Sequence, residues 1–247
     1  TLCNFGVQAT LSNSHGSIII LYILTRHVLA QKNRKEIESG IWAGMLCLKL
    51  QYVPLPHFIL LLNRAWAGLF AGVLVVTVLV GGAFLFLGEQ TLIQYLQIIR
   101  RYSGSENDWT NPLRGMHNLR ALTGVWLPDS WSGIVWISTM AAALFAVIWI
   151  NLRARHLTNG FEKSWISNSI ALLLLSPHLF THDLSLLIIP IALLFQIHGP
   201  RVPVWLGVGV VAVSLLPALN YLLPTIMAGA LVILFLLSLR LTRPEQV

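Results

Sequence analysis

The segment ALLLLSPHLFTHDLSLLIIPIALL, from Ala171 to Leu194, places a short polar island, SPHLFTHD, between two apolar runs. The island contains His178, His182 and Asp183, whereas the flanking runs contain no charged residue. Insertion of an aspartate at the centre of a membrane helix costs ~2.5–3.5 kcal/mol. A carboxylate in these surroundings therefore predicts a partner, water or a bound ligand.

The rest of the 247-residue chain has the same apolar character. Hydrophobic residues make up 56% of it and charged residues only 10%, against about 25% charged residues in an ordinary soluble domain. The formal charge is +7, but the basic residues lie in short connectors rather than in one patch. This placement argues against nucleic acid as a partner and favours a topology signal with some attraction to membrane lipids.

The predicted fold is all-α, a multi-pass transmembrane helical bundle that forms one domain over residues 1–247. Because Pro54 and Pro56 follow Lys49 within one apolar run, we expect a broken, re-entrant pair of half-length helices there. Basic connectors on one side place the C-terminus in the cytoplasm and the chain in the cell (plasma) membrane. The predicted segments are spans over residues 8–30, 66–87, 132–151, 165–176, 184–197, 203–219 and 222–239, half-helices near 40–50 and 55–63, and one longer extracytoplasmic loop over residues 88–131.

Two interpretations of the island are open. In one, Asp183 caps the N-terminus of the following helix, as aspartates often do, and the histidines are interfacial polar residues. In the other, the island contacts a ligand, with His178 and His182 on one face if the turn is helical. The spacing H-x-x-x-H-D is a weaker pattern than the usual zinc motifs, so we predict no metal.

Lys49 is a second unusual residue, since LCL and LQYVP surround it with apolar neighbours. It is either a snorkelling or ion-paired structural lysine, or it contacts an anionic group such as a lipid phosphate. In NPLRGMHNLRAL, basic residues that include Arg120 recur every three positions, which fits a solvated helix face or a binding surface. The island is expected to lie in a cavity that opens on the outer side of the membrane. Gln8, in GVQATLSNSHG, is expected to line this outer cavity.

The order of these segments resembles glycosyltransferase family 87. The stretches that carry the resemblance are AGMLCLKLQYVPLPHFILLLNRAWAGLFAG, MHNLRAL and SPHLFTHDLSLLIIPIALL. The resemblance implies a GT-C fold with an outward-facing active site. It also implies that a sugar, expected to be mannose, passes with inversion from a polyprenyl-phosphate donor to a lipid or glycan acceptor. No cofactor is implied beyond this lipid-linked sugar donor.

The resemblance also suggests roles for particular residues. Lys49 and Arg120 would face the leaving phosphate, and His178, His182 and Asp183 would line the sugar or acceptor pocket, with Lys49 and Asp183 converging on it. The catalytic aspartate of GT-C enzymes usually follows the first transmembrane helix, and no matching acidic loop is visible near Thr1. We therefore expect the chain to be a C-terminal part of a longer enzyme, with an unknown general base upstream of Thr1.

Two other functions are compatible with the pattern. A transporter or flippase of an anionic or lipid-linked substrate would use broken helices for a midplane site, but it predicts inverted halves, and the sequence shows no internal symmetry. A non-catalytic membrane scaffold predicts that Lys49 and Asp183 have structural partners and that no cavity lies between them.

Overall fold

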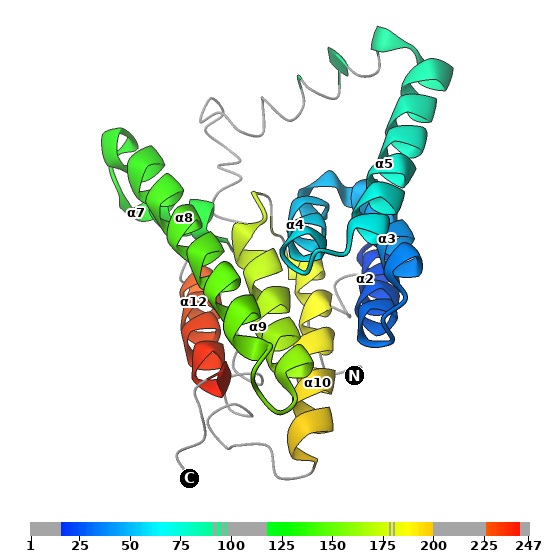
Figure 1. Cartoon of the computed structure of the whole chain (residues 1–247). Coiled ribbons are helices and arrows are strands. Elements are labelled where there is room, and N and C mark those ends of the chain that lie inside the picture. Colours follow the sequence, from blue (N-terminus) through cyan, green and yellow to red (C-terminus); the bar gives the residue numbers. More distant parts are fainter. Residues whose placement is uncertain are drawn as a thin grey trace. The chain divides into compact units, whose positions relative to one another are not determined.

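The computed structural model describes residues 16–90, 93–94, 97, 118–177, 179, 181–199 and 226–242. Within these residues every regular element is a helix, which confirms the predicted all-α class (Figure 1). The chain forms two compact units, the first made of residues 1–25 and 113–247 and the second of residues 26–112. Helix α2 (Ser17–Lys32) contributes residues to both.

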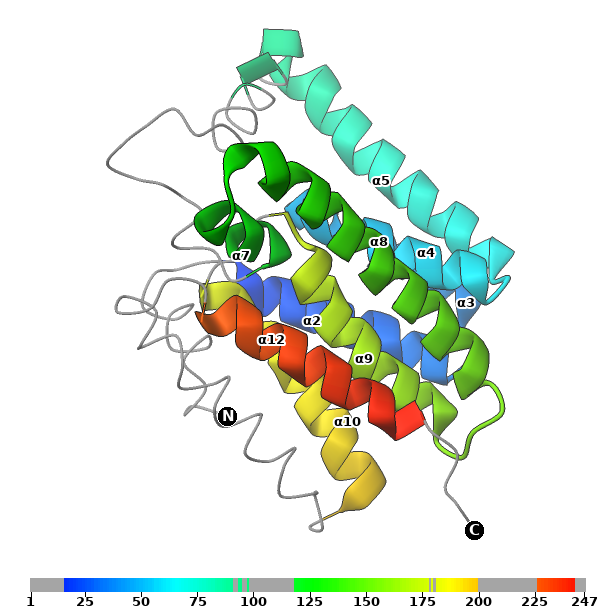
Figure 2. The same ribbon diagram turned by 90° about the vertical axis from the view of Figure 1, so that its left-hand side faces the viewer.

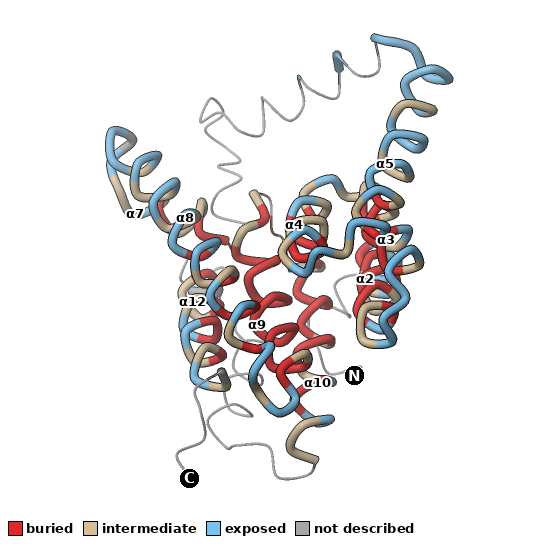
Figure 3. Tube along the Cα trace, in the orientation of Figure 1, coloured by how far each residue is buried: buried red, intermediate tan, exposed pale blue. Residues whose placement is uncertain are grey.

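Helix α9 (Gly160–Leu175) is the centre of the first unit. It packs against α8 (Asp129–Ala154), α10 (Ile188–His198) and α12 (Ile226–Ser238), as Figure 2 shows. Almost all of its residues are buried (Figure 3). Among its described residues the unit also contains α7 (Leu119–Trp126), which packs on α8, and the 3₁₀ helices η3 (Thr181–Leu187) and η5 (Leu239–Thr242).

Small polar side chains hold α9 to its neighbours. The amides of Asn151 on α8 and Asn168 on α9 exchange two hydrogen bonds, at 2.9 and 3.1 Å. Ser238 Oγ of α12 donates to Ser167 Oγ of α9 at 2.9 Å. Small and polar residues of this kind let helices approach closely and bond where no water competes. They explain why a helix with three serines and an asparagine is nevertheless almost entirely buried.

The second unit contains α3 (Glu36–Met45), the 3₁₀ helix η1 (Leu46–Tyr52), α4 (Pro54–Leu62) and α5 (Trp66–Leu87). Two pairs of glycines bring α3 and α5 into backbone contact. A Cβ at Gly40 would collide with the carbonyl of Gly68, and a Cβ at Gly44 would lie 2.5 Å from the carbonyl of Gly72. Since the pairs advance together along both helices, α3 and α5 run parallel.

Within the part of the chain that the structure describes, two helices, α5 and α8, are long and apolar enough to cross a membrane. The 22 residues of α5 rise ~33 Å, which matches the ~30 Å hydrocarbon core. Large apolar side chains on both helices face outward, for example Phe86 at 92% exposed and Phe145 at 70%. Helices that are core elements of a soluble protein would bury such side chains.

The break in the predicted re-entrant segment is confirmed, but it lies at Lys49 rather than at the prolines. Lys49 has φ −137° and ψ 84° inside η1, whereas Val53, before Pro54, is helical. In a continuous α-helix, Pro54 could not donate to the Leu50 carbonyl and its ring would clash with that group, which favours an interruption in this segment. In the structure α3 ends at Met45 and α4 starts at Pro54.

One other predicted span agrees with the structure, and most of the remaining boundaries differ. The predicted span 66–87 coincides with α5, whereas spans 132–151 and 165–176 correspond to the longer α8 and to α9, which starts five residues earlier. The predicted span 184–197 begins as η3 and becomes α-helical only at Ile188. The predicted loop 88–131 contains α7, and the described parts of spans 8–30 and 222–239 correspond to α2 and α12. Residues 8–15, 98–117 and 222–225 of these segments lie outside the described residues. Span 203–219 lies outside the described residues.

Candidate functional site

The carboxylate of Asp183 is deeply buried, with 1% of its side chain exposed. Its Oδ1 accepts a hydrogen bond from Ser17 Oγ at 2.8 Å. Its Oδ2 lies 3.7 Å from His182 Nε2, close enough for an ion pair when the imidazole is protonated but too far for a hydrogen bond. A hydroxyl donor and an adjacent imidazole therefore offset part of the cost of burying this charge.

The backbone around Asp183 is shaped by the end of α9. Ser176 precedes Pro177 and adopts an extended conformation, with ψ 127°, because proline disfavours a helical residue before it. The carbonyl of Ser176 accepts a 2.6 Å hydrogen bond from Asn118 Nδ2, whose side chain is completely buried. This bond fixes the start of α7 against the end of α9 and satisfies a carbonyl that the helix leaves free.

Ser185 contributes a second buried polar group to η3. Its side chain is 0% exposed, and its Oγ has no hydrogen-bond partner among the described residues. Residues three apart eclipse each other in a 3₁₀ helix, so Ser185 and His182 lie on the same face. A buried hydroxyl without a partner is rare in native proteins and marks a position where a polar ligand group or water would be stabilised.

The structure corrects two expectations about the island. Asp183 does not cap α10, because the N-cap of that helix is Leu187 and makes no side-chain cap bond. The island is only partly helical, since Ser176 is extended and Leu179 is outside any helix, whereas residues 181–183 belong to η3. The condition under which His178 and His182 would share a helical face is therefore not met at Leu179, and His178 itself lies outside the described residues.

Lys49 and its neighbours form a separate polar group in the second unit. Lys49 Nζ lies 5.7 Å from the centroid of the Tyr52 ring, within the range of a cation–π interaction. The Tyr52 side chain is completely buried, whereas Lys49 is half-buried. The ammonium group therefore stands at the helix break with an aromatic ring beside it.

His57, on α4, adds a nitrogen that lacks a partner. Its Nδ1 lies 2.9 Å from the carbonyl of Val53, so that nitrogen carries the proton and donates it. Its Nε2 is buried and has no hydrogen-bond partner among the described residues. Gly72 of α5 leaves room for this ring, since a Cβ there would come 2.5 Å from Nε2.

The remaining predicted site residues are distributed more widely. The Arg120 guanidinium carbon lies 5.7 Å from the centroid of the Trp136 ring, and burial lowers the pKa of Arg120 from its usual value. Lys49 and Asp183 belong to different units, so their convergence on one pocket stays a prediction. The described residues contain no group of three or more metal-binding side chains.

The expectations for the N-terminal end of the chain fall on residues that the structure does not describe. Thr1 and Gln8 both precede residue 16, where the description begins. The place of Gln8 in the outer cavity therefore stays a prediction. The general base that we expected upstream of Thr1 also stays a prediction, and we assign that role to no described residue.

Three buried polar residues were not singled out by the sequence: Ser17, which bonds to Asp183, Asn118, which bonds to the Ser176 carbonyl, and Ser185 of η3. The signal for Ser17 was its place at the start of an apolar run, directly after the polar letters SNSHG. Asn118 lies inside the MHNLRAL stretch, where the basic residues were the more conspicuous. Nothing in the sequence distinguishes Ser185 from the other serines of apolar segments.

Comparison with known proteins gives one match. The family model for glycosyltransferase family 87 matches residues 6–177, which is more than two thirds of the chain. Gln8, Lys49 and Arg120 lie inside the matched range, whereas His178, His182 and Asp183 follow its last residue. The searches of curated proteins and of solved structures returned no match.

Proposed function

We propose, from the premise that this chain belongs to glycosyltransferase family 87, that it transfers a sugar, which we take to be mannose, from a polyprenyl-phosphate donor. The acceptor is a lipid or a glycan on the extracytoplasmic side of the cell membrane. The family match over residues 6–177 is the observation that carries this proposal. The exposed apolar surfaces of α5 and α8 support a membrane setting, in which a lipid-linked donor is accessible.

The overall fold in this proposal is a GT-C bundle of several membrane spans, with the C-terminus in the cytoplasm. The broken segment around Lys49 supports it, because non-helical backbone is tolerated at membrane depth where it lines a cavity.

In the transfer step, the acceptor hydroxyl attacks the anomeric carbon and the bond between that carbon and the phosphate oxygen breaks. The acceptor proton passes to a general base, and the lipid phosphate leaves as an anion, so configuration inverts. Lys49 would stabilise the charge that develops on the leaving phosphate, with Arg120 as a second cation. Asp183 and His182 would bind hydroxyl groups of the sugar or acceptor, and His178 and Gln8 would extend that pocket.

The test uses the full chain reconstituted in liposomes with a labelled acceptor lipid. Polyprenyl-phosphate mannose and a nucleotide-linked mannose are offered separately as donors, and both binding and transfer are measured. Donor binding is informative by itself because it does not need the general base. Binding or transfer from the nucleotide sugar alone would overturn the donor class that we propose.

Variants test the residue roles in the same assay. Lys49→Gln is expected to lower kcat by about 10²-fold if the ammonium group stabilises the leaving phosphate, and Lys49→Arg is expected to retain most of the rate. Asp183→Asn is expected to raise KM for the sugar donor or the acceptor. Glu36→Gln, at an exposed carboxylate, is the matched control for loss of a negative charge. Unchanged kinetics in both site variants would remove them from the substrate site.

A further inference from the structure

Two turns in the second unit have the same backbone hydrogen bonds. One follows α2 and the other follows α4, and each leads directly into the next helix. In both, the pattern is that of a Schellman C-cap, in which the residue after the helix end is left-handed. The bonds, all 2.9 to 3.0 Å long, run from Arg34 N to Gln31 O and Lys35 N to Ala30 O in the first turn, and from Arg64 N to Leu61 O and Ala65 N to Leu60 O in the second.

An arginine occupies the left-handed position in both turns. Arg34 has φ 57° and Arg64 has φ 56°. Glycine normally fills this position, because a Cβ is unfavourable in the left-handed region. The backbone therefore gives no reason for arginine at either place, and the guanidinium groups are the feature that needs an explanation.

The two arginines lie at the same end of one helix pair. Helix α3 begins two residues after Arg34, and α5 begins two residues after Arg64. The beginnings of these parallel helices are in contact, since a Cβ at Gly68 would come 2.6 Å from the carbonyl of Glu36. Two equivalent turns therefore present their arginines on a common surface.

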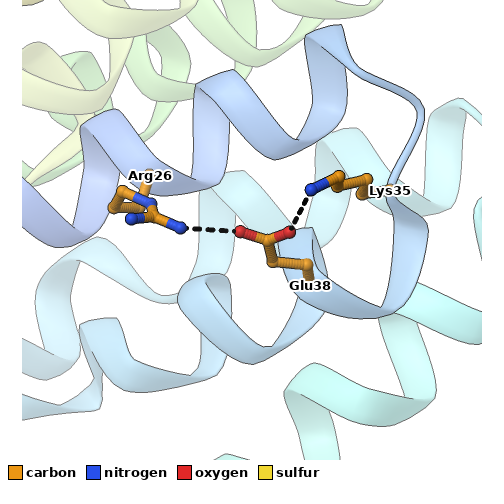
Figure 4. Close-up of polar contacts among 3 residues, drawn as sticks. All are labelled: Arg26, Lys35 and Glu38. Atoms are coloured by element: carbon orange, nitrogen blue, oxygen red, sulfur yellow. Dashed lines mark hydrogen bonds and ion pairs between the residues drawn. The ribbon is translucent and has the colours of Figure 1, made fainter.

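This surface keeps an excess of positive charge. Residues 26–38 and 63–66 contain five lysines and arginines but two acidic residues. Of the two acidic side chains, Glu38 is engaged by Arg26 and Lys35, at 2.9 and 3.3 Å (Figure 4). Arg34 and Arg64 are exposed, and the described part of the chain provides neither with a side-chain hydrogen bond or an ion pair.

The same end of α5 has the features of a membrane boundary. Trp66, two residues after Arg64, is 52% exposed and begins the apolar helix that is long enough to cross a membrane. Tryptophan is enriched where helices pass through the headgroup layer, and basic residues at that level attract anionic headgroups. We propose that Arg34 and Arg64 form a binding surface for the headgroups of anionic phospholipids at the membrane face where α5 begins. The inference rests on the membrane setting of the proposed function but not on sugar transfer.

The test compares phosphatidylglycerol with phosphatidylcholine as ligands of the purified full chain in neutral detergent, with lipid binding measured by native mass spectrometry. Each arginine near a headgroup layer is expected to contribute about fivefold to the preference for the anionic lipid. The double variant Arg34→Gly/Arg64→Gly should therefore lose about 25-fold of this preference. Because glycine suits the left-handed backbone, the variant should fold at least as well as the parent.

Two controls separate charge from backbone effects. Arg34→Lys/Arg64→Lys keeps both charges and should keep most of the preference. Asn159→Gly relaxes the third non-glycine residue with a left-handed backbone, at φ 54°, without a change of charge, and should leave the preference unchanged. Lipid binding and sugar transfer are separate readouts, so loss of transfer with a normal lipid preference would count against the proposed function alone.

Two results would overturn the inference. One is an unchanged preference for phosphatidylglycerol in the double glycine variant. The other is saturation of the same surface by glycerol phosphate at concentrations similar to those of the lipid, which would identify a soluble phosphate site instead of a lipid surface.

Discussion

Ser17 Oγ donates a 2.8 Å hydrogen bond to Asp183 Oδ1 and so joins two residues that are 166 positions apart in the sequence. Both side chains are buried, at 0% and 1% exposed. The bond ties the beginning of α2 to η3 within the first unit, and it provides the buried carboxylate with a hydroxyl donor from outside the island.

Removal of this donor should destabilise the first unit. Ser17→Ala leaves Asp183 Oδ1 without this hydrogen bond, so we expect the free energy of unfolding to fall by about 1–3 kcal/mol. Thermal unfolding in detergent, followed by tryptophan fluorescence, measures the change. Thr77→Ala is the matched control, because that hydroxyl is exposed and bonds only to the Val73 carbonyl of its own helix among the described contacts. Equal shifts in the two variants would contradict the structural role of Ser17.

The glycine contacts between α3 and α5 predict a large difference between two apparently identical substitutions. Gly40→Ala should force the helices apart and cost about 1–3 kcal/mol, because its Cβ would overlap the carbonyl of Gly68. At Gly81, on α5, an added Cβ meets open space, so Gly81→Ala should stabilise the helix by about 0.5–1 kcal/mol. The two substitutions should shift the thermal midpoint in opposite directions. An unchanged midpoint in Gly40→Ala would refute the close packing of α3 and α5.

The amide pair between α8 and α9 predicts non-additive mutations. Asn151→Leu or Asn168→Leu alone leaves a buried amide without its partner, whereas the double variant removes both amides together. A double-mutant cycle should give a coupling free energy of about 0.6 kcal/mol, up to about 1.7 kcal/mol, the range measured for polar pairs between membrane helices. Simple addition of the two single effects would show that the two amides do not bond to each other.

The ion-pair network at the start of α3 predicts a pH dependence. The hydrogen bond from Arg26, and then that from Lys35, lowers the pKa of Glu38 below its usual value of 4.5. A carboxyl group whose pKa is lowered by folding stabilises the folded state above the unfolded pKa, and this contribution is lost as the pH falls through the folded pKa. Glu38→Gln should therefore lower the thermal midpoint at neutral pH, with a smaller effect below pH 4.5.

Salt provides the check on this network. Because the three side chains are partly exposed, salt at about 1 M should reduce the difference between the parent and Glu38→Gln at neutral pH. A difference that stays constant with both pH and salt would show that Glu38 acts through packing rather than through its charge.

The helical class and the position of α5 could be predicted because an apolar run of this length is compatible only with a helix. The break near Lys49 was also visible, since prolines cannot continue a helix. Its place at Lys49 could not be predicted, because proline disfavours a continuous helix without fixing which preceding residue leaves the helical conformation. The 3₁₀ form of residues 181–187 had no signal, because its apolar letters suit an α-helix equally well.

The partners of the candidate site were harder to predict than its charged members. Asp183 stands out because a carboxylate is conspicuous among leucines. Ser17 and Asn118 do not, because serine and asparagine are common at helix starts and only tertiary contacts reveal their bonds. For the same reason the capping role expected for Asp183 was wrong, since its carboxylate bonds to a distant helix instead of to the backbone of α10.

The parallel contact of α3 with α5 also defines how far α3 reaches along the length of α5. Gly44, near the end of α3, touches Val75, which is the tenth residue of the 22 in α5. If α5 crosses the bilayer from one face to the other, α3 stops close to halfway, and the chain must turn back there through η1. The length of α3 then sets the depth of the Lys49 ammonium group, which lies near the middle of the lipid layer. Lengthening α3 by one turn would move that charge by ~5.4 Å along the bilayer normal.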